Sequence, residues 1–184
     1  MKTEDFLREV VALPGVTGNE GAVAQYIAKA FEPYCDDVKI DCMNSVIGHI
    51  AGNGPKVILC AHLDEIGLMV SAIGSDGTLM VTKIGGIYPT TYPGPKVRIY
   101  TKNGIIYGAV ANSRSIAKNK DLDASALRID IGAENKEDAK KYVELGDTVT
   151  FDFEGFVDDV VLHSVVAGSE EILAELLAEK LNRL

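Results

Sequence analysis

The chain has 184 residues, 47% of them hydrophobic, and its 27 acidic and 18 basic side chains give a formal net charge of −9 at pH 7. This composition is typical of a folded globular protein and excludes the disordered and fibrous classes. The negative charge would repel a phosphate backbone, so nucleic acid is not expected as a partner. The mixed charges at the amino terminus are unlike a signal peptide, and no run of about 18 apolar residues occurs. We therefore expect a cytoplasmic protein without membrane contact.

The first part of the chain predicts two amphipathic helices. Residues 4–13 place apolar side chains on one helical face, and Pro14 then ends this helix. Residues 20–34 repeat the pattern, with Asn19 available as the amino-terminal cap. Both helices need an apolar surface to pack on.

Three short strands are expected next, over residues 37–42, 45–51 and 56–61. The third is almost continuously apolar, a pattern that is typical of a strand buried on both faces. We expect it at the centre of an α/β sheet.

From residue 66 onward the sequence is rich in short β-type runs separated by turn signals such as Asp76-Gly77 and Asn103-Gly104. Six strands are expected, near residues 66–73, 78–84, 96–101, 105–110, 127–130 and 147–152. Together they predict a small, closed barrel. One short helix, over residues 136–143 with Asn135 as its cap, interrupts the barrel. A last amphipathic helix is expected over residues 169–184.

The segment that is most indicative of chemistry lies where the apolar strand ends, and it reads Cys60-Ala61-His62-Leu63-Asp64-Glu65-Ile66-Gly67. A histidine at the carboxyl end of a central strand, with an aspartate two residues later, suits a metal ligand whose ring is oriented by a carboxylate. A histidine that only hydrogen-bonds locally fits the same short pattern equally well.

Over residues 3–152 the chain resembles the glutamyl or tetrahedral aminopeptidases, a family of cocatalytic metal peptidases that also includes proteins named endoglucanases. The stretches that carry the resemblance are Leu13-Pro14-Gly15-Val16-Thr17-Gly18-Asn19-Glu20, Ala61 to Val70, Ile84-Gly85-Gly86, Val97-Arg98-Ile99, Gly108-Ala109-Val110, Ile129 to Ala133 and Leu145 to Val149. Several motifs in this order are a specific match.

The resemblance implies a fold of the α/β class: a reduced α/β/α peptidase-type layer, formed by residues 1–65 and 155–184, with a small β-barrel inserted at residues 66–154. It implies that His62 is a metal ligand, that Asp64 is a catalytic residue supporting the site, and that His163 corresponds to the family's last ligand. The cofactor would be zinc or cobalt, which polarises the carbonyl and lowers the pKa of an attacking water. The reaction would release amino-terminal residues from peptide substrates.

The chain departs from the family pattern after residue 152, where further carboxylate ligands and a glutamate base would be expected. Asp158 and Asp159 resemble a polar turn more than a metal-bridging position, and His163 fits a surface or packing residue better than a ligand. Glu65 is assigned no catalytic role, because on an extended segment it points away from Asp64. His49 matches no motif and is taken as structural.

Two functions therefore stay open. The chain is part of a metal aminopeptidase whose missing ligands come from elsewhere, or it is a non-catalytic assembly protein that is inactive alone and binds no metal. In both cases we expect a homo-oligomer, or docking on a full-length peptidase subunit, since an incomplete α/β layer exposes apolar surface.

Overall fold

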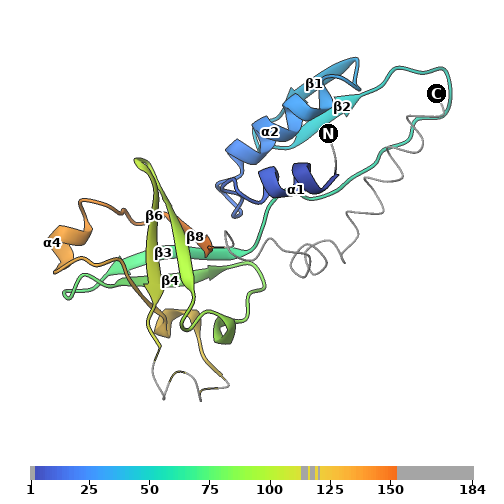
Figure 1. Ribbon diagram of the computed structural model, residues 1–184. Coiled ribbons are helices and arrows are strands. Elements are labelled where there is room, and N and C mark those ends of the chain that lie inside the picture. The colour runs from blue at the N-terminus through green and yellow to red at the C-terminus, as the bar shows by residue number, and fades with distance from the viewer. Residues whose placement is uncertain (1–2, 113–115, 117–118, 120, 153–184) are drawn as a thin grey trace. The chain divides into compact units, whose positions relative to one another are not determined.

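The computed structural model describes residues 3–112, 116, 119 and 121–152. These residues divide into two compact units, each of which is described by itself (Figure 1). The first unit includes residues 3–13 and 22–63. The second includes residues 14–21 and the described part of 64–152. The expected helix at 169–184 lies outside the described residues.

The first unit begins with helices α1 (Thr3–Val10) and α2 (Gly21–Phe31), which confirm the two helices expected there with shorter bounds. An aromatic pair connects them, because the ring centroids of Phe6 and Tyr26 lie 5.6 Å apart. The Tyr26 hydroxyl donates a hydrogen bond of 2.7 Å to the Glu9 carboxylate. This bond is the main reason that the pKa of Tyr26 is raised to about 12. The helices thus hold each other through one apolar and one polar contact.

Strands β1 (Asp37–Ile40) and β2 (Val46–His49) form an antiparallel hairpin in the first unit. Their turn contains Asn44 in the left-handed region, at φ 63°. Gly48 is required by packing, because a Cβ atom there would lie 2.7 Å from Cys35 Sγ and 2.9 Å from Phe31 Cδ2. The missing side chain lets the end of α2 approach β2 closely.

The expected central strand over residues 56–61 is wrong. The structure has no helix or strand there, and the side chains of Val57, Ile58 and Leu59 are exposed by 79%, 84% and 53%. A strand forms only where neighbouring strands satisfy its backbone hydrogen bonds. Among the described residues the sheet of the first unit contains only β1 and β2. The apolar pattern therefore predicts an environment that this pair of strands does not provide.

The second unit is a closed antiparallel barrel, which confirms the expected barrel and all six of its strands. The strands are β3 (Gly67–Ile73), β4 (Leu79–Ile84), β5 (Lys96–Thr101), β6 (Gly104–Val110), β7 (Arg128–Asp130) and β8 (Thr148–Phe151). Their order around the barrel is β3-β4-β7-β6-β5-β8. The barrel closes between β3 and β8, where Leu68 is opposite Val149.

Alternation along the strands fills the barrel with aliphatic side chains. Those that are fully buried include Leu68, Val70, Leu79, Val81, Val97, Ile99, Ile129 and Val149, and Leu127, directly before β7, joins them. The short 3-10 helices η1 (Pro89–Thr91) and η2 (Ala124–Ala126) lie in the connections between strands. The ring of Tyr92, directly after η1, stacks on Phe151 with centroids 4.0 Å apart. The barrel thus has a hydrophobic core of its own.

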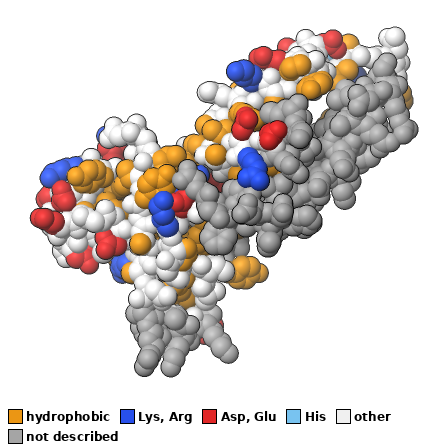
Figure 2. Space-filling model, in the orientation of Figure 1, with side chains coloured by type: hydrophobic (Ala, Val, Ile, Leu, Met, Phe, Trp, Pro, Cys, Tyr) orange, Lys and Arg blue, Asp and Glu red, His pale blue; other side chains and the backbone are white. Residues whose placement is uncertain are grey.

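Helix α4 (Lys136–Ala139) connects β7 with β8 and is shorter than the expected helix over 136–143. The Asn135 side chain caps it as predicted, accepting hydrogen bonds from the backbone of Glu137 and Asp138. Figure 2 shows acidic and basic side chains interspersed on the visible face of the barrel. Among the described residues, no helix has the length and apolar character needed to cross a bilayer.

Candidate functional site

The structure divides the predicted His62–Asp64 segment between the two units: His62 belongs to the first and Asp64 to the second. The His62 side chain is exposed, and that of Asp64 is half-buried. Because residues 56–61 form no strand, His62 does not follow the end of a strand as the sequence predicted. What links His62 and Asp64 here is their sequence spacing of two residues.

Asp64 is held by a residue that sequence reasoning did not assign. The Thr17 hydroxyl donates a hydrogen bond of 2.6 Å to Asp64 Oδ2. The residues are 47 positions apart in the chain, so no local pattern could reveal the contact. A short bond to a carboxylate is charge-assisted and stronger than one between neutral groups.

Thr17 lies on a segment, residues 14–21, that is bonded into the second unit. An isolated parallel bridge pairs Val16 with Glu65. In this bridge the Glu65 amide donates to the Gly15 carbonyl at 2.7 Å, and the Thr17 amide donates to the Glu65 carbonyl at 3.2 Å. Two backbone bonds therefore fix the residues next to Asp64 and the residue that bonds its carboxylate.

Packing against the barrel strands also fixes residues 14–21. Val16 has an exposed fraction of 0%, and a Cβ atom at Gly67 would lie 2.7 Å from Val16 Cγ2. The Asn19 side-chain amide donates to the Thr148 hydroxyl on β8 at 2.8 Å. Gly18 allows the turn between these contacts, at φ 92°. The motif around Thr17 is thus a structural part of the barrel unit.

Glu65 has an unusual environment, although the sequence assigned it no role. Burial raises its pKa from 4.5 to about 7, against smaller lowering effects of a hydrogen bond with the Gly15 backbone and of the Arg98 charge. Burial, with the nearby Glu65 charge, also raises the pKa of Tyr92 to about 12. Desolvation of a carboxylate favours its protonated form, so Glu65 exchanges its proton near neutral pH.

A partly buried ion cluster next to this glutamate joins β5 to Asp152, the residue after β8. Arg98 Nε donates to Asp152 Oδ1 at 2.9 Å, and Lys96 Nζ lies 2.6 Å from Asp152 Oδ2. The side chains of Arg98 and Asp152 are only 8% and 4% exposed. Both cations neutralise Asp152, which is the condition for burying its charge. Sequence reasoning missed the cluster, because Arg98 is on a strand that reads as core.

An open groove of about 510 Å³ lies on the second unit beside the Thr17 segment. It is lined by Pro14, Thr17, Gly18, Asn19, Met69, Ile84, Tyr100, Thr101, Lys102, Gly104, Ile105, Gly146, Asp147 and Thr148. Burial, as the largest effect, raises the pKa of the Asp147 carboxyl, and Lys102 pairs with Glu144. The groove carries charges of both signs.

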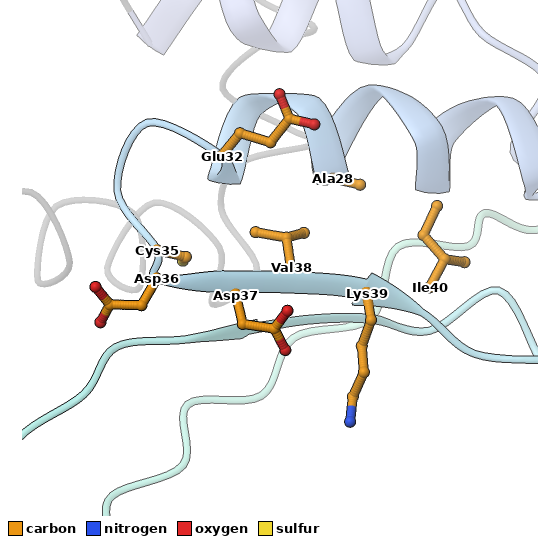
Figure 3. Close-up of a pocket in the computed structure, with 8 residues that line it drawn as sticks. All are labelled: Ala28, Glu32, Cys35, Asp36, Asp37, Val38, Lys39 and Ile40. Carbon is orange, nitrogen blue, oxygen red and sulfur yellow. The ribbon is translucent and has the colours of Figure 1, made fainter.

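The first unit also has a hollow, which lies between α2 and β1 (Figure 3). Val38 and Ile40 point toward α2, while Lys39 points away from it, as strand alternation requires. The Asp36 carboxylate has a structural role, because it accepts a hydrogen bond of 2.6 Å from the Ala51 amide. This hollow is a helix–strand junction without convergent donor groups.

A complete metal centre is not formed within the described residues, where no group of three or more His, Cys, Asp or Glu side chains is placed to hold a metal ion. His163, the predicted last ligand, lies outside the described residues, as do Asp158 and Asp159. An imidazole at His62 with a carboxylate at Asp64 is a donor set that suits zinc or cobalt.

Comparisons with known proteins agree with these motifs. Residues 44–159 match the M42 glutamyl aminopeptidase family. The lysyl aminopeptidase of Pyrococcus furiosus is 35% identical over 144 residues, which cover 74% of this chain and 42% of that protein. The chain spans less than half the length of this and another curated relative that it matches.

Solved structures give the same result. The TET1 peptidase of Pyrococcus horikoshii, which assembles into a tetrahedron or a large octahedral shell, matches with a TM-score of 0.70 and 30% identity, covering 80% of this chain and 46% of that chain. A Thermotoga maritima protein named an endoglucanase matches with a TM-score of 0.66 and 31% identity, covering 79% and 44%. The motifs, the barrel and these matches together show that the chain belongs to the M42 glutamyl aminopeptidase family.

Proposed function

We propose that this chain acts in a metal-dependent aminopeptidase, to which it contributes a metal ligand and the carboxylate that orients it. Family membership supports the reaction class, which is the release of amino-terminal residues from peptides. The observation that carries the proposal is the short Thr17–Asp64 hydrogen bond, because it holds a carboxylate two residues after His62. A carboxylate that is hydrogen-bonded to a metal-ligating imidazole keeps the ring in one tautomer and one orientation.

Zinc or cobalt is the cofactor that the donor set favours. His62 would bind the metal, Asp64 would orient the His62 ring, and His163 is proposed as a further ligand. When bound, the metal would polarise the peptide carbonyl and lower the pKa of a water molecule. The Thr17 hydroxyl, which donates to Asp64 Oδ2, would help to hold the Asp64 carboxylate in place.

We propose that the two units correspond in their main parts to the domains expected from sequence: a reduced α/β/α peptidase-type layer from residues 1–65 and 155–184, and a barrel over 66–154 that is inserted into it. Residues 14–21 and 64–65 are the exception, because they belong to the barrel unit. The barrel with its own core also favours a second candidate function, assembly without catalysis. The TET1 peptidase forms large shells, and by analogy this chain would form homo-oligomers or dock on a full-length peptidase subunit.

Calorimetric titration with zinc and with cobalt tests the first candidate on the wild type, His62→Ala and His49→Ala. His49 is a matched control, since it is an exposed histidine at the end of β2. We expect binding by the wild type and His49→Ala, and loss of at least ten-fold in affinity for His62→Ala. An aminoacyl-nitroanilide assay on the same samples measures turnover. Binding that is equal in all three proteins would contradict the role of His62, and oligomers without binding or turnover would favour the assembly function.

A further inference from the structure

The open groove of about 510 Å³ on the barrel unit has no assigned role. Its lining residues all belong to the second unit, so its shape is independent of how the two units are placed. Three of them are glycines, Gly18, Gly104 and Gly146, and a Cβ atom at any of these would have no neighbour within 4 Å. The groove therefore has the volume of a small-ligand site, about 300–1,000 Å³, with backbone walls that leave space beside them.

The charged side chains around Asp147 leave one net negative charge in this groove. Lys102 pairs with Glu144, and the charges of both act on the Asp147 carboxyl. One ammonium and two carboxylates give a net charge of −1. Burial is the largest effect on Asp147 and raises its pKa, because desolvation disfavours the ionised form. A cation bound beside Asp147 would offset this cost, so the groove suits a positively charged group.

Asp147 uses one carboxylate oxygen within the fold and leaves the other for a ligand. Its Oδ2 accepts a hydrogen bond of 2.8 Å from the Glu144 amide. Its Oδ1 accepts none from the part of the chain that the structure describes, where no buried side-chain oxygen lacks a partner, so Oδ1 is open to solvent. A guanidinium binds a carboxylate best through both oxygens, whereas an ammonium is a point charge. One remaining oxygen therefore favours an ammonium.

Aliphatic side chains line the groove close to this oxygen. Met69 on β3 is half-buried and lies opposite Thr148, the residue after Asp147. Ile105 on β6 also lines the groove and is 44% exposed. A lysine side chain has a four-carbon apolar stem, which it commonly lays along apolar surface while its charged end reaches a polar group. The groove provides a surface for both parts of such a side chain.

We propose that this groove binds a lysine side chain of a peptide, with the ammonium at Asp147 Oδ1 and the stem along Met69 and Ile105. The choice of a peptide as the ligand rests on the proposed function, whereas the binding itself needs neither a metal nor the first unit. The barrel unit then recognises a peptide by a side chain, separately from the release of its amino-terminal residue.

The test is an NMR titration of the full chain in EDTA with N-acetyl-alanyl-lysyl-alanine amide. The acetyl group blocks the amino terminus, so binding is measured apart from turnover, and the norleucine analogue keeps the apolar stem without the charge. Asp147→Asn removes the charge but keeps an oxygen for the Glu144 amide. Asp130→Asn is the matched control, because this exposed aspartate also accepts from a backbone amide, that of Gly132 at 2.8 Å.

We expect the lysine peptide to shift the amide signals of Gly104 and Gly146. Its affinity should fall about three- to ten-fold in Asp147→Asn, between the effect of an exposed ion pair and that of a buried charged hydrogen bond, and stay unchanged in Asp130→Asn. The norleucine peptide should bind more weakly by a similar factor. Glu144→Gln, at an exposed residue, should also weaken binding, because it leaves the Lys102 charge uncompensated beside Asp147. This second variant keeps the test valid if Asp147→Asn does not fold.

Three results would overturn the inference: no shift with the lysine peptide, equal binding of the lysine and norleucine peptides, or wild-type affinity in Asp147→Asn and Glu144→Gln. Pentylamine that binds as tightly as the lysine peptide would overturn the assignment to a peptide. Failure of the wild type to bind zinc in the calorimetric titration would contradict the proposed function alone, because the peptide titration contains no metal.

Discussion

The half-buried Glu65 couples the stability of the barrel unit to pH. Its pKa is raised by burial to about 7 in the folded state, from 4.5 when unfolded, so the folded state binds its proton more tightly. The resulting stabilisation is fully present below about pH 4.5 and is lost as the pH rises through 7. A shift of this size corresponds to about 3 kcal/mol of the free energy of unfolding.

Glu65→Gln should remove this dependence, because the amide is never ionised. Urea unfolding at pH 5 and pH 8 should show a smaller loss of stability on raising the pH in Glu65→Gln than in the wild type. Glu134→Gln, at an exposed glutamate of the same unit, is the control and should behave as the wild type. An unchanged pH dependence in Glu65→Gln would show that Glu65 titrates as an ordinary surface carboxylate.

At the scale of elements, the contact between residues 14–21 and β3 depends on one glycine. A Cβ atom at Gly67 would lie 2.7 Å from Val16 Cγ2 and 2.8 Å from the Val149 carbonyl oxygen on β8. The carbonyl belongs to the strand pair that closes the barrel, so it cannot move without breaking the pairing. We expect Gly67→Ala to lower the free energy of unfolding by about 1–3 kcal/mol, measured by urea titration.

Gly86 provides the matched control for this substitution. A Cβ atom at Gly86 would have no neighbour within 4 Å. Gly86→Ala should therefore change the free energy of unfolding by less than about 0.5 kcal/mol. Similar losses in both variants would show that the cost comes from glycine's backbone and not from the close approach of Val16.

The barrel could be predicted strand by strand because its signals are local. The sequence of a hairpin itself contains the alternation with period two and the glycine of the turn, such as Gly77 and Gly104 at φ 84° and 116°. The segment at residues 56–61 shows the opposite case. Its apolar pattern is as strong, yet whether it becomes a strand depends on neighbours that its own sequence does not specify.

The candidate site could be predicted only in part, for a related reason. The spacing of His62 and Asp64 is visible in the sequence, and the resemblance gives it a chemical meaning. The Thr17 contact joins residues 47 positions apart, and the raised pKa of Glu65 comes from burial, which outweighs the lowering effect of the Arg98 charge. Such properties arise from the fold, so they become visible only in three dimensions.

At the scale of the whole molecule, the exposed side chains of Val57, Ile58 and Leu59 favour self-association. Contiguous apolar surface of this kind marks contact sites in soluble proteins. We expect a dimer or a larger assembly by light scattering at micromolar concentration. Ile58→Asp should shift the protein toward the monomer, whereas Tyr88→Asp, at an exposed residue of the barrel unit, should not. A wild type that is monomeric under these conditions would contradict the expected assembly.

The seam between β3 and β8 also determines when the barrel can form. It joins Leu68 to Val149, so about 80 residues must be synthesised and ordered before the last hydrogen bonds close. Contacts of such long sequence separation slow folding, because the loop entropy is lost before the contacts stabilise the chain. Until β8 arrives, β3 and β5 each present an open edge that can pair with another chain. On the ribosome, we therefore expect an aggregation-prone open sheet until the final strand emerges. A chaperone that binds strand edges should raise the folding yield.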